Sequence, residues 1–222
     1  MESRPGSLLD WAYAQIRQML FSGELKSGEK IVVGQLAEKL AISPTPVKEA
    51  LNRLVAQGVL AALPYRGFMV KPLNGKSIQD ILDCRLMMEV FSTRQAVENF
   101  EKHPEIEREM LSALVEMQTL DPEDYVQTTH LEQIYHGSFV RLTENEHLIE
   151  LYNNSFGVGF SFYVYAATNQ PIKTPELAQK EHHEMYKCLK DKNPSELEHL
   201  MRTHLGRTLE LYKSFVPPDV SK

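Results

Sequence analysis

The chain has 222 residues, 42% of them hydrophobic, and a formal net charge of −6 at pH 7. This length suggests one or two domains with a sizeable core, and no run of about 18 apolar residues predicts a membrane span. Cys84 and Cys188 are isolated and form no CxxC pair, so neither a zinc finger nor a secreted disulfide framework is expected. Because the N-terminus also lacks the pattern of a signal peptide, we expect a cytoplasmic protein.

Charge is distributed unevenly along the chain. Residues 1–72 carry nine Lys or Arg and six Asp or Glu, whereas the remainder carries 15 basic and 24 acidic residues and all eight histidines. A mildly basic front and an acidic, histidine-bearing back indicate two parts with different partners. We therefore predict a first domain over 1–72, a linker over 73–76 and a second domain over 77–215.

The first domain shows a helix-turn-helix pattern. An amphipathic helix is predicted over 8–21, a short extended run over 31–33 and a second helix over 35–40. A third helix follows, with Ser43 as its N-cap, two prolines tolerated in its first turn and Gly58 at its C-terminal end. We expect the Ser43 hydroxyl to accept hydrogen bonds from the free amides of that first turn.

A β-hairpin follows the third helix. The runs 59–63 and 68–71 are expected to pair around a turn at 64–67. Helices and hairpin in this order are typical of a winged helix-turn-helix, which places one helix in a DNA groove. Polar side chains on the outer face of the third helix suit phosphates and base edges. The candidate DNA-binding residues are Ser43, Thr45, Lys48, Asn52, Arg53, Arg66 and Gly67.

The second domain is predicted to be helical throughout. Three helix starts combine a cap residue, a proline at the first helical position and an acid in the first turn, namely Asp121-Pro122-Glu123, Thr174-Pro175-Glu176 and Asn193-Pro194-Ser195-Glu196. Ser77, Pro104 and Asn145 indicate three further starts. The fold is therefore predicted as mainly α, with a winged helix-turn-helix before an all-α six-helix bundle. Its helices are expected over 77–101, 104–118, 122–142, 146–168, 175–191 and 194–214.

Helical periodicity places polar side chains inside this bundle. His182 and His204 each share a stripe with apolar residues, and Glu132 and His136 lie four residues apart on a third helix. Arg85 lies in an apolar stripe of the first helix of the bundle. One carboxylate and imidazoles from facing helices can ligate one divalent cation. Periodicity alone leaves open the alternative that these are hydrogen-bonded core histidines.

The sequence resembles a known family over nearly its whole length. Residues 8–71 resemble the winged-helix domain of GntR-family repressors, through SGELKSGEKI, LAEKLAISPTPVKEALNRLVAQGVL and YRGFMV. Residues 76–214 resemble the FCD effector domain of the FadR subfamily, through QDILDCRLMMEV, LEQIYHGSF and EHHEMYKCLKDKNPSELEHLMRTHL. This resemblance implies a ligand-responsive transcriptional regulator. Two-fold symmetry in protein and operator then predicts a homodimer on a pseudo-palindromic double-stranded DNA operator.

The resemblance also implies a metal site. In the family the positions of Glu132, His136, His182 and His204 bind a divalent transition metal, commonly zinc, nickel or manganese. The metal and the arginine that matches Arg85 hold a small organic acid, the effector. Two alternatives stay open, a regulator that senses the metal alone and a metal with a purely structural role. A metal-dependent enzyme is not expected, because no nucleophile elbow, P-loop or paired Glu-x-x-His motif on inward helix faces is present.

Four positions depart from the family pattern. Gly34 and Pro44 stand where members often carry Arg, and Lys48 replaces the commoner Arg, which keeps the charge but loses the bidentate fork. We therefore expect a base preference that differs from the usual operator. Glu132 replaces the usual Asp, and its extra methylene is expected to shift the metal or change its affinity.

Overall fold

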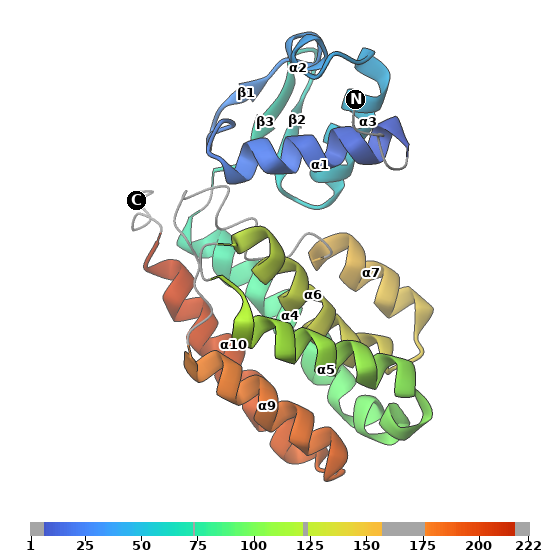
Figure 1. Ribbon diagram of the computed structural model, residues 1–222. Coiled ribbons are helices and arrows are strands. Elements are labelled where there is room, and N and C mark those ends of the chain that lie inside the picture. The colour runs from blue at the N-terminus through green and yellow to red at the C-terminus, as the bar shows by residue number, and fades with distance from the viewer. Residues whose placement is uncertain (1–6, 73, 122–123, 157–175, 216–222) are drawn as a thin grey trace. The chain divides into compact units, whose positions relative to one another are not determined.

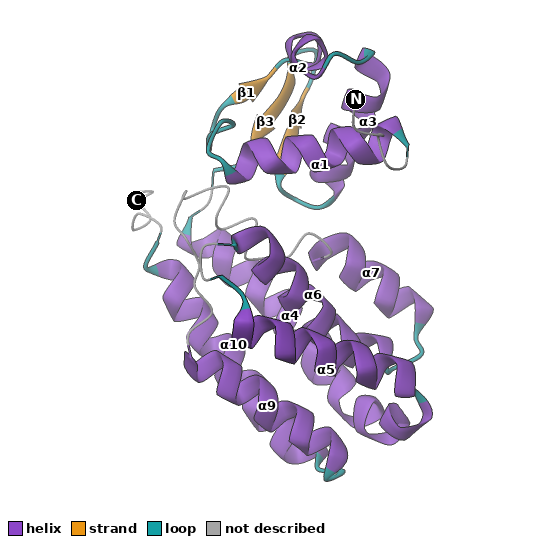
Figure 2. Cartoon of the chain, in the orientation of Figure 1, coloured by secondary structure: helices purple, strands orange, loops and turns teal. Residues whose placement is uncertain are grey.

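The computed structural model describes residues 7–72, 74–121, 124–156 and 176–215, which belong to two compact units. The described strands all lie in the first unit, and the described part of the second unit is helical (Figure 2). The prediction of a mainly α chain, with a winged helix-turn-helix before a helical domain, is confirmed. Over the ranges given above, no helix is long and apolar enough to cross a membrane.

The first unit packs three helices over a small sheet. Buried residues of α1, including Ile16 and Leu20, face α3, which contributes Leu51 and Leu54 to the same core. The amphipathic spacing of these residues places them on one face of each helix. The elements are α1 (Leu8–Phe21), β1 (Lys30–Ile31), α2 (Val33–Leu40), α3 (Pro44–Ala56), β2 (Leu60–Leu63) and β3 (Gly67–Val70).

The sheet is antiparallel, in the order β1-β3-β2. The predicted hairpin is confirmed as β2 and β3, with Leu63 opposite Gly67. The extended run predicted over 31–33 is shorter, because Val32 already serves as the N-cap of α2. Gly67 has φ +93°, and a Cβ added to it would lie 2.5 Å from the carbonyl oxygen of Ile31. Only glycine therefore lets β3 approach β1 this closely.

The N-terminus of α3 corrects one prediction. Ser43 occupies the N-cap position with an extended backbone, but its hydroxyl accepts no hydrogen bond from the first turn. The reason is local, because an N-cap side chain bonds the second or third amide of a helix and Pro46, at the third position, has none. Gly58, in contrast, has the positive φ expected just beyond the end of α3.

The second unit is built around one long helix. Figure 1 shows α4 among the other helices, and it packs against α6, α7, α9 and α10. A buried cluster between α5, α6, α9 and α10 includes Met110, Tyr135, Phe139 and Met201. The described elements are α4 (Gly75–Asn99), the 3-10 helix η1 (Phe100–Lys102), α5 (Pro104–Thr119), α6 (Tyr125–Arg141), α7 (Glu146–Phe156), α9 (Glu176–Lys190) and α10 (Pro194–Lys213).

Capping residues fix most of these helix starts. Asn145 and Asn193 accept hydrogen bonds from the first turns of α7 and α10, as predicted. Helix α4 begins two residues early, because Asn74 rather than Ser77 is its cap. Helix α6 begins late, because Asp124 accepts the capping bond from the amide of Gln127. The helix predicted over 146–168 is described as α7 to Phe156, and its remainder lies outside the described residues.

Candidate metal centre and DNA-binding surface

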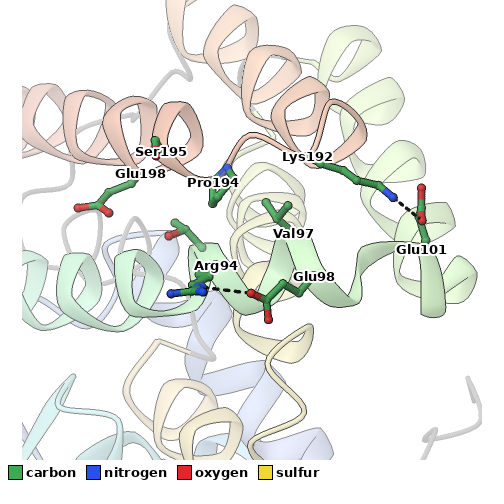
Figure 3. A pocket seen from close by; sticks show the side chains of 9 residues that line it. Arg94, Val97, Glu98, Glu101, Lys192, Pro194, Ser195 and Glu198 are labelled. Atoms are coloured by element: carbon green, nitrogen blue, oxygen red, sulfur yellow. Dashed lines mark hydrogen bonds and ion pairs between the residues drawn. The ribbon is translucent and has the colours of Figure 1, made fainter.

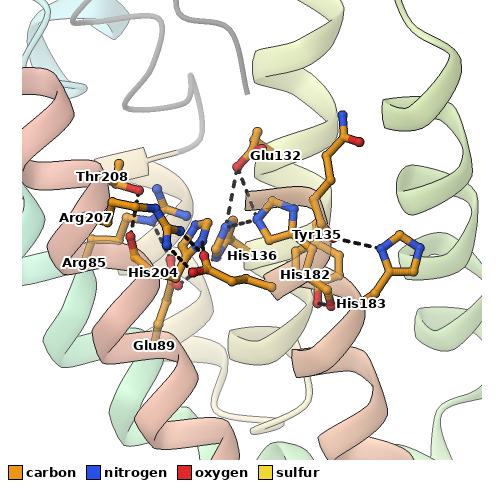
Figure 4. A network of polar contacts seen from close by, with 12 residues as sticks. Arg85, Glu89, Glu132, Tyr135, His136, His182, His183, His204, Arg207 and Thr208 are labelled. Atoms are coloured by element: carbon orange, nitrogen blue, oxygen red, sulfur yellow. Dashed lines mark hydrogen bonds and ion pairs between the residues drawn. The ribbon is translucent and has the colours of Figure 1, made fainter. Parts of the chain in front are cut away.

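Four side chains from three helices meet inside the second unit (Figure 4). Glu132 and His136 come from α6, His182 from α9 and His204 from α10, and one ligand atom of each lies within 4.8 Å of the others. The Nε2 atoms of His136 and His182 are 3.2 Å apart. Oε2 of Glu132 is 3.5 Å from the first and 3.8 Å from the second. The three rings are buried, and the Glu132 side chain is 16% exposed. Periodicity predicts all four on inward faces, and the fold brings one ligand atom of each together.

Two further carboxylates orient the imidazoles. Glu89 on α4 lies 2.9 Å from Nδ1 of His136, and Glu181 on α9 lies 2.8 Å from Nδ1 of His204. An ionised carboxylate can only accept, so Nδ1 donates in both pairs and, in the neutral rings, Nε2 keeps its lone pair. Carboxylate–histidine pairs of this kind fix the tautomer of metal-ligating histidines. Both Nε2 atoms are thereby set toward the middle of the cluster.

The orienting carboxylates are themselves held by cations. Glu89 accepts a hydrogen bond from Nε of Arg85 at 2.6 Å and from the hydroxyl of Tyr152 at 2.7 Å. Burial opposes ionisation of Glu89, but Arg85 and His136 outweigh it and lower its pKa to about 2. Both terminal nitrogens of Arg207 donate to Glu181. Burial likewise opposes ionisation of Glu181, while His204 and Arg207 lower its pKa to about 2. Both groups are therefore carboxylates over the physiological pH range.

The pKa values of the clustered residues are shifted in different directions. Burial lowers the pKa of His182 well below its ordinary value, and it lowers the pKa of His204 although Glu181 opposes this. Burial and Arg85 also act against the charged form of His136, but Glu89 and Glu132 overcome them and raise its pKa. The pKa of Glu132 is lowered despite burial, because His182 and His136 stabilise the carboxylate. The neutral rings of His182 and His204, beside the ionised Glu132, are donors that suit a divalent cation, and His136 would join them by releasing its proton.

His182 is held differently from the other two histidines. Among the described residues, its Nδ1 atom is buried and has no hydrogen-bond partner. The ring instead packs beside Tyr135, with 4.7 Å between ring centroids, and the Tyr135 hydroxyl donates to the backbone carbonyl of His182. An unpartnered buried nitrogen is costly in a core histidine. His182 therefore differs from a core histidine whose two ring nitrogens are both hydrogen-bonded, and Nε2 is its atom that faces the cluster.

Sequence reasoning missed the residues behind the ligands. Arg85, which the sequence predicts inside the bundle, donates to Glu89, and Glu89 in turn contacts His136 of the cluster. Glu89, four residues after Arg85, continues the same buried stripe. Glu181 shares a buried stripe with Met185 and Cys188. These stripes were the available signal, although a charged residue in such a stripe is normally assigned to the surface.

Most of the candidate DNA-binding residues lie at or near one groove of the first unit. A groove of about 460 Å³ between α3 and the wing is lined in part by Thr45, Lys48, Asn52 and Gly67. Ser43, at the start of α3, and Arg66, at the wing tip, are exposed. Tyr65, at the same tip, also lines the groove and was missed, although an aromatic residue in a hairpin turn is a visible signal.

Arg53 faces another element. Its guanidinium lies 4.2 Å from the ring centroid of Tyr13 and 3.4 Å from Asp10, both on α1. Thr45, Lys48 and Asn52 of α3 instead line the groove beside the wing. Arg53 is thus held against α1, where a cation–π contact and an ion pair fix its direction.

A winged helix-turn-helix joined to a helical domain with a buried His/Glu cluster defines a class, that of DNA-binding transcriptional regulators with a second, helical domain. Residues 9–70 match the model of the bacterial regulatory proteins of the gntR family, and residues 80–207 match the FCD domain. The chain therefore belongs to the GntR family, in the group that carries an FCD domain.

Similar proteins agree with this assignment. The chain is 30% identical over 205 residues to the HTH-type transcriptional regulator McbR of Escherichia coli (strain K12), with 90% of each chain covered. It is 27% identical over 150 residues to the gluconate operon transcriptional repressor of Bacillus subtilis (strain 168), with 67% of this chain and 60% of that one covered. These relatives are transcriptional regulators rather than enzymes.

Solved structures share the fold. E. coli McbR/YncC aligns with a TM-score of 0.69 at 21% identity, over 94% of this chain and 98% of that chain. A putative GntR regulator from Rhodococcus sp. RHA1 aligns with a TM-score of 0.71 at 16% identity, over 96% and 100% of the two chains. The metal-free FCD domain of TM0439 aligns with a TM-score of 0.51 at 18% identity, over 64% and 96%.

Proposed function

We propose that this regulator is controlled by a small organic acid that binds beside a divalent transition metal in the second unit. The observation that carries the proposal is the convergence of Glu132, His136, His182 and His204, whose ligand atoms lie within 4.8 Å of one another. Two of the rings are oriented by carboxylates that turn their Nε2 atoms inward. Such oriented donors from facing helices are what a metal site in a bundle requires.

These four residues would hold the metal. Three imidazoles and one carboxylate suit zinc, nickel or manganese. When bound, the metal would supply a positive charge with an open coordination position for a carboxylate oxygen of the effector. The protein would contribute a buried setting around three of the ligands, while the partly exposed Glu132 marks the side open to solvent.

Arg85 would provide the second contact for the effector. Glu89 accepts from its Nε, and a guanidinium has four further N–H donors on its terminal nitrogens. Those donors match the planar geometry of a carboxylate. A second acid group of the effector would thus meet a fixed cation, because the pairing with Glu89 holds Arg85 in place.

The DNA-binding part of the proposal concerns symmetry. Thr45, Lys48, Asn52 and the wing line one groove in each chain, and two chains related by a two-fold axis would present two such surfaces. A dimer of this kind would read a pseudo-palindromic operator. An effector that binds one dimer arrangement more tightly than another would change the spacing of the two surfaces and so the operator affinity.

Native mass spectrometry of the purified full chain tests the metal. We expect a metal-loaded dimer for the wild type and for His183→Ala, and loss of the metal in His182→Ala. His183 is a matched control because it is adjacent but exposed, and bonds Gln179 and Gln118 instead of the cluster. Retention of the metal by His182→Ala would contradict the assigned ligands.

Operator binding then separates the roles of the metal. Binding is titrated first with metal alone and then with metal plus a panel of organic acids. A response only in the presence of an acid supports the proposal, whereas a full response to metal alone indicates a metal sensor. If His182→Ala lowers thermal stability but leaves the acid response unchanged, the metal is structural.

A further inference from the structure

Helix α4 has two opposite faces. Arg85 and Glu89 point into the bundle and are buried. On the opposite side, Met87 is 65% exposed and Phe91 is 60% exposed. At 3.6 residues per turn, six residues fall within one narrow strip of this exposed side. We refer to them as the outer row of α4, and they are Lys76, Asp80, Met87, Phe91, Arg94 and Glu98.

The middle of the outer row is apolar and its ends are charged. Single exposed apolar side chains are common on protein surfaces, but Met87 and Phe91 are neighbours at a spacing of four residues. Cys84 and Asp83 are exposed on either side of this pair, and Asp83 accepts a hydrogen bond from Gln79. Ion pairs flank this apolar centre, with Lys76 bonded to Asp80 at one end.

At the other end of the outer row, Arg94 is paired with Glu98 at 3.1 Å (Figure 3). Both side chains stand at the edge of a groove of about 680 Å³ between α4 and the start of α10, which is lined in part by Val97 and Pro194. Arg94 and Glu98 are more than half exposed, so their charges are available to an outside partner.

The charges of the outer row are arranged symmetrically about Met87. Asp80 and Arg94 each lie seven residues from it, and Lys76 and Glu98 each lie eleven residues from it. In both pairs the two members carry opposite charges. A second copy of this helix, rotated by two-fold symmetry about Met87, would therefore match every negative charge of the row with a positive one.

We propose that the homodimer forms through antiparallel pairing of two α4 helices, with the two-fold axis at Met87. Asp80 of one protomer then meets Arg94 of its partner, and Lys76 meets Glu98, while Met87 and Phe91 are covered at the centre. Parallel pairing is disfavoured, because it would place each charge of the row against its own copy. The inference rests on the proposed dimer and names its contact surface.

The distance between the charged side chains across the proposed helix pair agrees with known helix packing. Two packed helices typically have axes 8–10 Å apart and cross at about 20° in the shallow class. With a rise of about 1.5 Å per residue, positions seven residues from the crossing point are then displaced sideways from each other by only roughly 4 Å. Arg94 and Asp80 side chains span that gap. A crossing of about −50° would carry the charged ends apart, so the pairing requires the shallow angle.

Charge swaps test the orientation of the two helices. In the full chain, we expect Asp80→Arg or Arg94→Asp alone to raise the dimer dissociation constant at least tenfold in sedimentation equilibrium. The double variant should restore it to within about threefold of the wild type, since the two charges exchange places. Failure of the double variant to restore dimerisation, with its helix content unchanged, would overturn the antiparallel pairing.

A cysteine at the axis tests the position of the contact. Met87→Cys in a Cys84→Ser background should form a covalent dimer under mild oxidation, because facing positions at the axis are within disulfide reach. Val115→Cys in the same background is the control, since Val115 on α5 is also 60% exposed but lies on another helix. A dimer that does not cross-link at position 87 has another interface. A chain that stays monomeric both free and on DNA would instead refute the dimer itself.

Discussion

Nδ1 of His204 donates a hydrogen bond to Glu181 at 2.8 Å, and Arg207 pairs with the same carboxylate. This relationship fixes the tautomer of His204 from outside the ligand set. With the proposed metal bound, the affinity of the site would depend on Glu181, which would never touch the metal.

The variant Glu181→Gln tests this dependence. The amide keeps the shape but removes the charge, and we expect a 10- to 100-fold loss of zinc affinity, which is typical of outer partners. Competition with a chelator measures it. Glu184→Gln on the same helix is the control, because Glu184 is exposed, and it should bind zinc as the wild type does. Equal affinities in the two variants would show that Glu181 has no part in the site.

Gly67 is expected to be the most sensitive glycine of the wing. Gly67→Ala would introduce a Cβ 2.5 Å from the carbonyl oxygen of Ile31, at φ +93°. We expect the free energy of unfolding to fall by about 1–3 kcal/mol, together with weaker operator binding. Gly34→Ala is the matched control, because no atom lies within 4 Å of an added Cβ. A thermal transition of Gly67→Ala that equals that of the control would contradict the close approach.

Salt dependence tests Lys48 as a phosphate contact. Lys48→Ala should reduce the slope of log affinity against log salt by about 1, uniformly across operator sequences. Lys39→Ala serves as the control, because Lys39 is also exposed but is paired with Glu24. A slope that Lys48→Ala leaves unchanged would place Lys48 away from the phosphates.

His103 is expected to make stability depend on pH. Its two ring nitrogens lie 2.8 Å from Glu105 and 2.8 Å from Glu144, and these hydrogen bonds raise its pKa above the ordinary 6.5. The protonated ring is therefore favoured in the folded state. Its contribution is complete below about pH 6.5 and disappears as pH rises through the raised value.

Replacing that side chain reveals the contribution. His103→Gln should be less stable than the wild type at pH 6, and the difference in the free energy of unfolding, from denaturant titrations, should shrink toward pH 8.5. His199→Gln, which changes an exposed histidine, should show no such trend. A difference that grows with pH would mean that the neutral ring is the stabilising form.

The inward placement of the four clustered side chains could be predicted, because helix periodicity indicates which face of a helix a residue lies on. His182 and His204 each stand in an apolar stripe, and Glu132 and His136 share one face by their spacing of four. The two carboxylates that bond the histidines, Glu89 and Glu181, could not be predicted. In the sequence they look like ordinary surface acids, and only the packing of the helices buries them. Glu89 is paired with Arg85 on its own helix, whereas Arg207, which pairs with Glu181, comes from a different helix.

The start of a helix could be predicted where neighbouring residues favour the same boundary. Asn193 and Pro194 mark the start of α10 because cap and proline agree. Ambiguity arose where two candidates compete, as at α6, which is capped by Asp124 although Asp121 precedes a proline. At Ser43 the serine correctly marks the start of α3, but the neighbouring prolines remove an amide that it would have bonded.

The flanking ion pairs of the outer row bear on the coexistence of related regulators in one cell. Chains with similar helical domains could exchange subunits and form mixed dimers with two different DNA preferences. The order of charges along α4 matches a second copy of itself in antiparallel pairing. A relative with the opposite order would place like charges against each other, which disfavours mixed dimers. Changing the order of charge along α4 would then create a second, independent pairing specificity on the same helical domain.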